Sequence, residues 1–210
     1  MYRLGVVVAL LATAWLSVSA DEVVLNETWS YLPGQYYNGD TLGDAWTVAG
    51  EVDIVGSGYY GYLCTDAGWT GQCLDLSGWT PGGVVTTAPL TFYAGVDYTL
   101  YFEAAGSQRP QWGPATNSFL VAVGNSAGDL VYFTSGPIAS TQDVLTFTIP
   151  FTPTETTQAS VRIVSLDSSG AIGALMGPVQ ITHAPEPASL VLMGTGLAAM
   201  GAMLRKRLKR

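Results

Sequence analysis

The sequence has 210 residues, of which 48% are hydrophobic and only 11% are charged. Fifteen acidic residues but only two basic ones, Arg109 and Arg162, lie between Asp21 and Ala184. So acidic a body repels phosphate backbones, which excludes nucleic-acid binding, and the apolar content together with many glycines predicts a folded domain rather than a disordered chain.

The N-terminus has the organisation of a secretory signal peptide. Arg3 precedes an apolar run from Leu4 to Leu16, and small residues lead up to Ala20, which Asp21 follows. We expect residues 1–20 to form a signal helix that the export translocon takes up and that is cleaved between Ala20 and Asp21. An uncleaved membrane anchor is the alternative, disfavoured because the run is short for a bilayer.

Short strands are predicted along the rest of the body. Apolar and polar side chains alternate from Tyr98 to Glu103 and from Leu145 to Ile149, as in strands with one face in a core and one in water. Clusters of Gly, Asn, Asp and Ser supply the turns between strands. Further strands are expected at 46–55, 73–76, 84–92, 118–123, 130–134, 159–165 and 178–182. Without a convincing amphipathic helix, the pattern predicts one all-β domain over residues 21–182, an antiparallel β-sandwich of the jelly-roll type.

Few residues offer catalytic or metal chemistry. The single histidine, His183, lies beside the C-terminal segment, which excludes a His-dependent nucleophile in the body. Paired carboxylates could hydrolyse a glycosidic bond, but so many acids make any one pair uninformative. The acids considered are Glu51, Asp53, Asp66, Asp75 and Glu103. We expect no catalytic residue, no cofactor and no metal, with calcium on scattered carboxylates left open.

Cys64 and Cys73 are the only cysteines. In an exported chain such a pair favours a disulfide, since a zinc site would need two more ligands and the histidine is distant in sequence. The sequence therefore predicts a Cys64–Cys73 disulfide.

Aromatic residues gather among glycines between Trp29 and Trp79, which predicts a loop-rich segment and a place for a functional surface. Exposed Trp and Tyr rings can pack against the flat C–H faces of sugars. Five rings are the predicted saccharide contacts: Tyr59, Tyr60, Trp69, Trp79 and Trp112. The alternative is that several of them fill the ends of the core.

The C-terminal segment, residues 183–210, has three parts in a fixed order. The triplet Pro185, Glu186 and Pro187 comes first, and an uncharged run from Ala188 to Leu204 follows. As a helix this run would be about 25 Å long against about 30 Å of hydrocarbon, so a single transmembrane helix is expected. The basic residues predicted to stay on the cytoplasmic side are Arg205, Lys206, Arg207, Lys209 and Arg210.

Together these three parts resemble the PEP-CTERM sorting signal of Gram-negative bacteria, also known as the C-terminal domain of ice-binding proteins. The resemblance implies that an exosortase-type membrane protease recognises the triplet and processes the chain, in species that make exopolysaccharide. It further implies transient anchoring in the inner membrane, then delivery to the outer cell envelope or extracellular matrix.

A second resemblance lies in the body. The stretches "CLDLSGWTPGG" from Cys73 and "LTFYAGVDYTLYFEAAGSQR" from Leu90 are similar to the galactose-binding-like jelly rolls of many such exported proteins. Ser107 stands where that pattern often has Asn, so no binding role transfers to this turn. The prediction is a non-enzymatic surface or matrix protein. A carbohydrate-binding module and a small extracellular glycan hydrolase are the alternatives.

Overall fold

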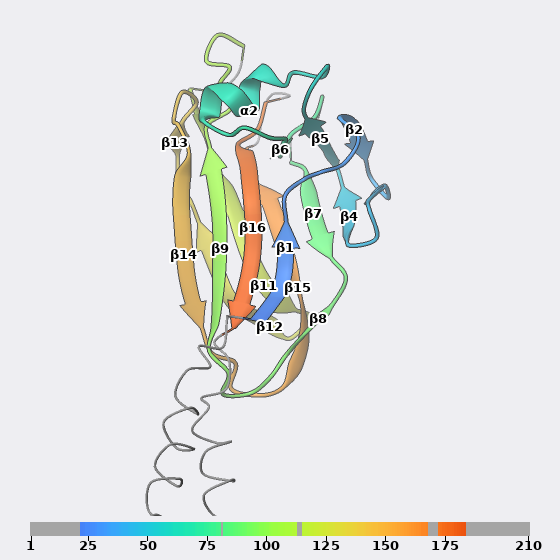
Figure 1. Ribbon diagram of the computed structural model, residues 1–210, viewed down its shortest axis with the longest axis vertical. Coiled ribbons are helices and arrows are strands. Elements are labelled where there is room, and N and C mark those ends of the chain that lie inside the picture. Colours follow the sequence, from blue (N-terminus) through green and yellow to red (C-terminus); the bar gives the residue numbers. More distant parts are fainter. Residues whose placement is uncertain (1–21, 81, 113–114, 168–171, 184–210) are drawn as a thin grey trace, which may run out of the picture. The chain divides into compact units, whose positions relative to one another are not determined.

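Two seven-stranded sheets form the body of the chain (Figure 1). The structure, a computed structural model, describes residues 22–80, 82–112, 115–167 and 172–183. The first sheet contains, in spatial order, β14 (Leu145–Phe151), β9 (Tyr98–Ala105), β16 (Leu175–His183), β6 (Cys73–Asp75), β5 (Glu51–Val55) and β2 (Gly34–Tyr37), and β1 (Glu22–Glu27) also pairs with β16. The second contains β12 (Gly128–Thr134), β11 (Phe119–Asn125), β15 (Thr157–Ser165), β7 (Val84–Thr87), β4 (Trp46–Ala49) and β3 (Thr41–Leu42), and β8 (Leu90–Phe92) also pairs with β15. A small ribbon joins β10 (Thr116–Asn117) to β13 (Ile138–Ala139).

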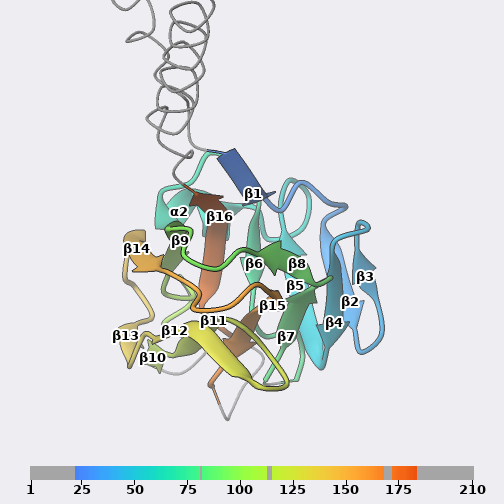
Figure 2. The same cartoon turned by 90° about the horizontal axis from the view of Figure 1, so that it is seen from below.

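In the second half of the body the chain alternates between the two sheets, which is the connectivity of a jelly roll. From β9 through β11, β14 and β15 to β16 the chain changes sheet at every step, with β12 added as the hairpin partner of β11. The ladders are antiparallel, as between β9 and β16 and between β11 and β15. Figure 2 shows β9 and β16 in one layer and β11 and β15 in the other. The predicted all-β antiparallel sandwich is confirmed.

The core lies between the sheets and follows from period-two alternation. Leu100 and Phe102 on β9 are fully buried, as are Phe119 and Val121 on β11. The rings of Phe102 and Phe119 meet across the two layers with centroids 6.1 Å apart. Because burying such a side chain contributes about 1.5–3 kcal/mol, this interior holds the sheets together.

Two segments expected to be single strands are divided. Residues 46–55 turn at Gly50, whose φ of 76° favours glycine, and pass from β4 in one sheet to β5 in the other. Residues 84–92 pair with β15 twice, first through β7 and then through β8. Alternation of apolar side chains does not reveal either interruption.

A short helix, α2 (Tyr62–Ala67), was not expected from the sequence. It ends at Gly68, whose φ is 114° and whose N–H donates to the carbonyls of Cys64 and Thr65. A disulfide joins Cys64 to Cys73 at the start of β6, with the Cα atoms 5.8 Å apart. The disulfide predicted from the cysteine count is therefore present, and it ties the helix to the first sheet.

The segment from Trp29 to Trp79 is more regular than its composition predicts. It supplies strands β2 to β6 as well as α2. Trp29 and Trp46 are fully buried, with ring centroids 5.3 Å apart, so they belong to the core. The loop-rich interpretation is wrong for these parts, because glycines and polar residues between short strands hide the alternation.

The two terminal segments fall largely outside the described residues. The structure does not describe the predicted signal helix of residues 1–20 or its cleavage site at Ala20 and Asp21. It also does not describe the predicted membrane helix from Ala188 to Leu204 or the basic residues after it. Within residues 22–183, the described stretches hold no helix long and apolar enough to cross a bilayer. The compact unit of the body runs from Val23 to His183.

Candidate functional site

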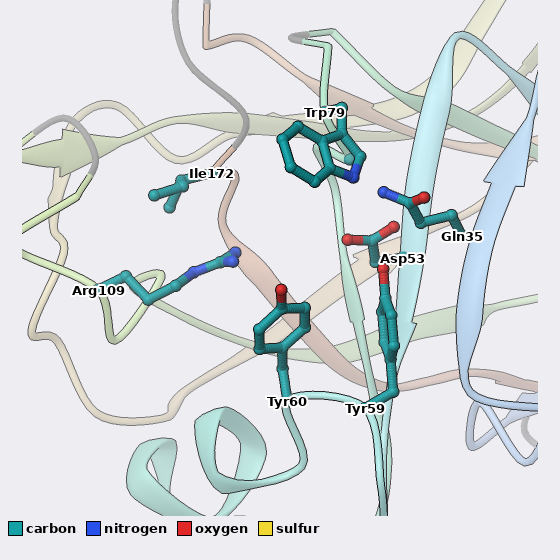
Figure 3. Close-up of a pocket in the computed structure, with 8 residues that line it drawn as sticks. Gln35, Asp53, Tyr59, Tyr60, Trp79, Arg109 and Ile172 are labelled. Atoms are coloured by element: carbon teal, nitrogen blue, oxygen red, sulfur yellow. The ribbon is translucent and has the colours of Figure 1, made fainter.

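A pocket of about 150 Å³ lies on the outer face of the first sheet (Figure 3). Val52 and Ile54 of β5 point into the core, so Asp53 between them points outward. Asp53 lies opposite Gln35 of β2 and Asp75 of β6 in the ladder, which places all three side chains on the same face. The lining residues are Gln35, Asp53, Tyr59, Tyr60, Gly78, Trp79, Arg109 and Ile172.

Asp53 supplies a buried carboxylate with unused hydrogen-bonding capacity. Its exposed fraction is 6%, and its Oδ1 atom has no hydrogen-bond partner within the structure. The pKa of Asp53 is raised to about 7, chiefly by burial and also by the nearby carboxylates of Asp75 and Glu51, while Arg109 opposes the rise. An acceptor held away from water and left unpartnered is costly, so this oxygen is suited to a ligand or a proton.

Asp75 is fully committed to the protein. It is completely buried, accepts hydrogen bonds from the backbone N–H groups of Ser77 and Gly173, each at 3.0 Å, and forms an ion pair with Arg109. Burial raises the pKa of Asp75 to about 6, although Arg109 and both N–H groups oppose this. Asp75 therefore fixes Arg109 at the wall of the pocket and does not itself face a ligand.

Arg109 comes from the loop that follows β9. The preceding residue, Gln108, has a φ of 56°, a left-handed conformation, and its N–H donates to the carbonyl of Ser140 at 2.8 Å. Ser107 is fully buried and its N–H donates to Asn117 Oδ1. These contacts hold the loop so that Arg109 reaches Asp75, while its own Nε has no partner in the structure.

Trp79 is presented to solvent by a loop that Glu51 holds. The Oε2 atom of Glu51 accepts hydrogen bonds from the Thr80 N–H and hydroxyl, both at 3.0 Å. A Cβ atom at Gly78 would lie 2.3 Å from Glu51 Cγ, so only glycine lets the loop pass this close to the carboxylate. The result is an indole with an exposed fraction of 74% directly beside the pocket.

Tyr59 and Tyr60 form the opposite wall. Gly56 and Tyr59 exchange two backbone hydrogen bonds of 3.0 and 2.9 Å, which closes a tight turn after β5. Tyr60 then adopts a φ of 50°, rare for a large side chain, and the two rings meet edge to face at 4.9 Å. Burial and the neighbouring Asp53 raise the pKa of Tyr59 to about 12, so its hydroxyl stays protonated and able to donate.

The structure brings three of the five predicted saccharide contacts together and leaves two apart. Tyr59, Tyr60 and Trp79 line the pocket. Trp69 instead packs over Gly177 and donates from Nε1 to Glu103 at 2.6 Å, a structural role. Trp112 has an exposed fraction of 70% but does not line the pocket.

Sequence reasoning missed the polar half of the site. Asp53 was considered only as one acid among many, and neither Gln35 nor Arg109 was considered as a ligand contact. A signal did exist for Arg109, because it is one of two basic residues between Asp21 and Ala184. So scarce a cation in an acidic domain points to a specific carboxylate partner.

The arrangement offers ring stacking and hydrogen bonding. Trp79 and Tyr60 provide partly exposed aromatic faces, and Asp53 and Gln35 provide polar groups beside them (Figure 3). Across the described stretches, no three His, Cys, Asp or Glu side chains are grouped so that they could hold a metal ion. A flat apolar surface next to a few fixed polar groups is the general form of a small-molecule site.

The C-terminal segment was compared with known protein families. Residues 183–207 match the PEP-CTERM protein-sorting motif. The match includes Pro185, Glu186 and Pro187 and stops before Lys209 and Arg210. It confirms the resemblance seen in the sequence, and the motif implies export and membrane-anchored processing by an exosortase.

Several solved structures are similar to the body. The CBM22-1 xylan-binding domain of Xyn10C from Paenibacillus barcinonensis shares 15% identity with a TM-score of 0.48, over 80% of this chain and 97% of that chain. The C-terminal CBM6 of LamC from Zobellia galactanivorans shares 13% with a TM-score of 0.40, over 75% and 98%. The K1 cleaved adhesin domain of Lys-gingipain from Porphyromonas gingivalis shares 14% with a TM-score of 0.44, over 75% and 96%. No curated protein matches the sequence.

Proposed function

We propose that the body of this protein binds a saccharide in the pocket and does so without catalysis. The observation that carries the proposal is the exposed Trp79 indole beside the buried, unpartnered Oδ1 of Asp53. A sugar ring offers an apolar C–H face to the indole and hydroxyl donors to the carboxylate, so one ring satisfies both. The pocket volume of about 150 Å³ is below the roughly 300–1,000 Å³ of sites for drug-sized ligands, which suits a single sugar unit.

Binding is favoured over hydrolysis by how the three nearby carboxylates are used. A glycosidase of the usual kind needs two carboxyl groups that both reach the scissile bond. Asp75 is sealed beneath Arg109, and Glu51 holds the loop of Trp79 through Thr80. Only Asp53 among these acids lines the pocket, which leaves the second catalytic position unfilled.

Replacing Trp79 by alanine is expected to weaken saccharide binding by about 30-fold, because an aromatic residue at the centre of a contact contributes about 2 kcal/mol or more. Trp112→Ala is the matched control, since this indole is equally exposed and lies outside the pocket. Affinity electrophoresis through a panel of soluble polysaccharides, followed by calorimetric titration of the best ligand, measures the effect. Equal losses in both variants, or turnover of a glycan by the wild-type body, would contradict the proposal.

The destination proposed for this binding activity is the outer envelope or the exopolysaccharide matrix. The PEP-CTERM motif supports membrane-anchored processing, and the N-terminal sequence supports prior passage through the translocon and cleavage after Ala20. The body would then reach the polymer that it binds.

Intact-mass analysis of the mature protein tests this route. We expect a chain that begins at Asp21, lacks the residues downstream of the Pro-Glu-Pro triplet, and is lighter by two hydrogens because of the disulfide. A variant with Pro185 and Pro187 replaced by alanine is expected to retain the C-terminal segment. A wild-type chain found with its C-terminus intact would argue for a permanent anchor instead.

A further inference from the structure

The Asp53 carboxylate has more negative than positive charge around it. Around the Asp53 carboxylate lie Glu51 on the same strand and Asp75 on β6, and a single guanidinium, that of Arg109, comes from the loop after β9. The side chains that face it from β2 and from the turn after β5 are the uncharged Gln35, Tyr59 and Tyr60. Arg109 is already engaged by Asp75, so the carboxylate of Asp53 has no cation of its own.

Among the residues that the structure describes, no other cation is near enough to pair with Asp53. Arg162, the second basic residue between Asp21 and Ala184, pairs with Asp129 at 2.6 Å and joins strands of the second sheet. A buried carboxylate oxygen with neither a cation nor a hydrogen-bond donor is stabilised by gaining a proton, a metal ion or a positively charged ligand. The described residues hold no group of three His, Cys, Asp or Glu side chains that could bind a metal ion. A proton or a cationic ligand is therefore favoured as the partner of Asp53.

We infer that the pocket takes an amino sugar whose free ammonium group binds the Asp53 carboxylate, a ligand class that rests on the saccharide binding proposed above. The ammonium donates to the unpartnered Oδ1 atom and neutralises the charge of Asp53, while the ring of the same sugar packs on Trp79. Figure 3 shows the Asp53 carboxylate between the Trp79 indole and the two tyrosines, where one sugar unit reaches both groups. An N-acetylated sugar offers only a neutral amide at that position, and a plain hexose only a hydroxyl.

Proton linkage distinguishes the ammonium from a neutral group. Burial raises the pKa of Asp53 to about 7, so below that pH much of the free protein holds a proton on this carboxyl. An ammonium favours the ionised form, which means that binding displaces the proton and strengthens as pH rises toward 7. A neutral sugar does not require this displacement.

Three β-1,4-linked tetrasaccharides with the same backbone form the test: cellotetraose, the N-acetylglucosamine tetramer and the glucosamine tetramer. Calorimetric titration at about pH 6.5 and low salt, where the ligand amine and the Asp53 carboxyl are each partly in their charged forms, is expected to give up to about tenfold tighter binding of the glucosamine tetramer, the value of one charge-assisted hydrogen bond. Titrations in two buffers of different ionisation enthalpy are expected to show proton release with this ligand only. Asp53→Asn should abolish both the preference and the proton release.

Asp66→Asn is the matched control, because it removes the same charge from an exposed position on α2 outside the pocket. Asp66→Asn should keep the preference for the glucosamine tetramer. If the acidic body merely attracts cations in general, both variants would show a weaker preference, and the inference would be overturned. A rise in melting temperature with calcium chloride that Asp53→Asn abolishes would assign the site to a metal and also overturn it. Binding that depends on Trp79 but shows no preference for the amine would overturn this inference and leave the proposed saccharide binding intact. Absence of binding to any glycan would overturn both proposals.

Discussion

Replacing Arg109 by methionine is expected to lower the free energy of unfolding by about 3 kcal/mol or more at about pH 8. Asp75 is completely buried, and Arg109 is the cation that compensates its charge. Methionine keeps much of the packing volume but leaves the carboxylate with only the N–H groups of Ser77 and Gly173. An uncompensated buried charge is far more costly than the loss of a surface ion pair.

The loss of unfolding free energy in Arg109→Met is expected to increase with pH. Burial already raises the pKa of Asp75 from 3.8 to about 6, and removing Arg109, which lowers it, raises it further. Between the two pKa values the folded chain holds a proton that the unfolded chain has lost, so stability falls as pH rises through that window. Arg109→Met moves the upper limit of this pH window to a higher pH. The difference in free energy of unfolding between the variant and wild type should therefore be larger at about pH 8 than at about pH 5.

Chemical denaturation followed by tryptophan fluorescence at the two pH values measures this. The double variant Asp75→Asn/Arg109→Met should recover part of the loss, because no buried charge remains. Arg162→Met is the matched control, since its pair with Asp129 is largely exposed, and it should cost less than about 1 kcal/mol. The same loss at both pH values would mean that Arg109 acts through packing alone.

Strands were predictable from the sequence where one face is buried along their whole length. β9 shows this best, because Tyr98, Leu100 and Phe102 alternate with half-buried residues just as the sequence alternates. β2 escaped prediction, since its four residues Gly34–Tyr37 bury little and have no alternating apolar face. The short helix α2 escaped prediction because six residues that end at a glycine are too few to show a helical period.

The aromatic part of the site was predictable only in part, and the charged part was not. Local composition in a Gly-rich stretch singles out Tyr59, Tyr60 and Trp79, but it singles out Trp69 equally, which lies outside the pocket. The juxtaposition of Asp53 with Asp75 depends on the register between β5 and β6, which are 22 positions apart in sequence at this pair. Register is set by the whole buried face and by the loops, so no short motif could report it.

Glu27→Gln is expected to lower the free energy of unfolding by about 3 kcal/mol, because a buried donor left without an acceptor costs about 1–3 kcal/mol. The Oε1 atom of Glu27 accepts from the backbone N–H groups of Thr28 and Trp29, and Oε2 accepts from the Tyr31 hydroxyl and from Trp46 Nε1 at 2.7 Å. If the amide nitrogen replaces Oε1, two backbone N–H donors face a donor; if it replaces Oε2, Trp46 Nε1 does, while the Tyr31 hydroxyl can turn to accept. Trp29, which has a φ of 56°, also loses a contact that holds its unusual backbone.

Glu155→Gln is the matched control for this network, since Glu155 is exposed and the same exchange there should change stability by less than about 0.5 kcal/mol. Denaturation followed by the fluorescence of the buried indoles of Trp29 and Trp46 reports on the affected region. If the free energy of unfolding of Glu27→Gln lies within about 0.5 kcal/mol of wild type, the four donors must find other acceptors. None of these groups lines the pocket. At denaturant concentrations well below those that unfold it, Glu27→Gln should therefore bind saccharide with the affinity of wild type. That result would show that Glu27 stabilises the fold and does not take part in sugar binding.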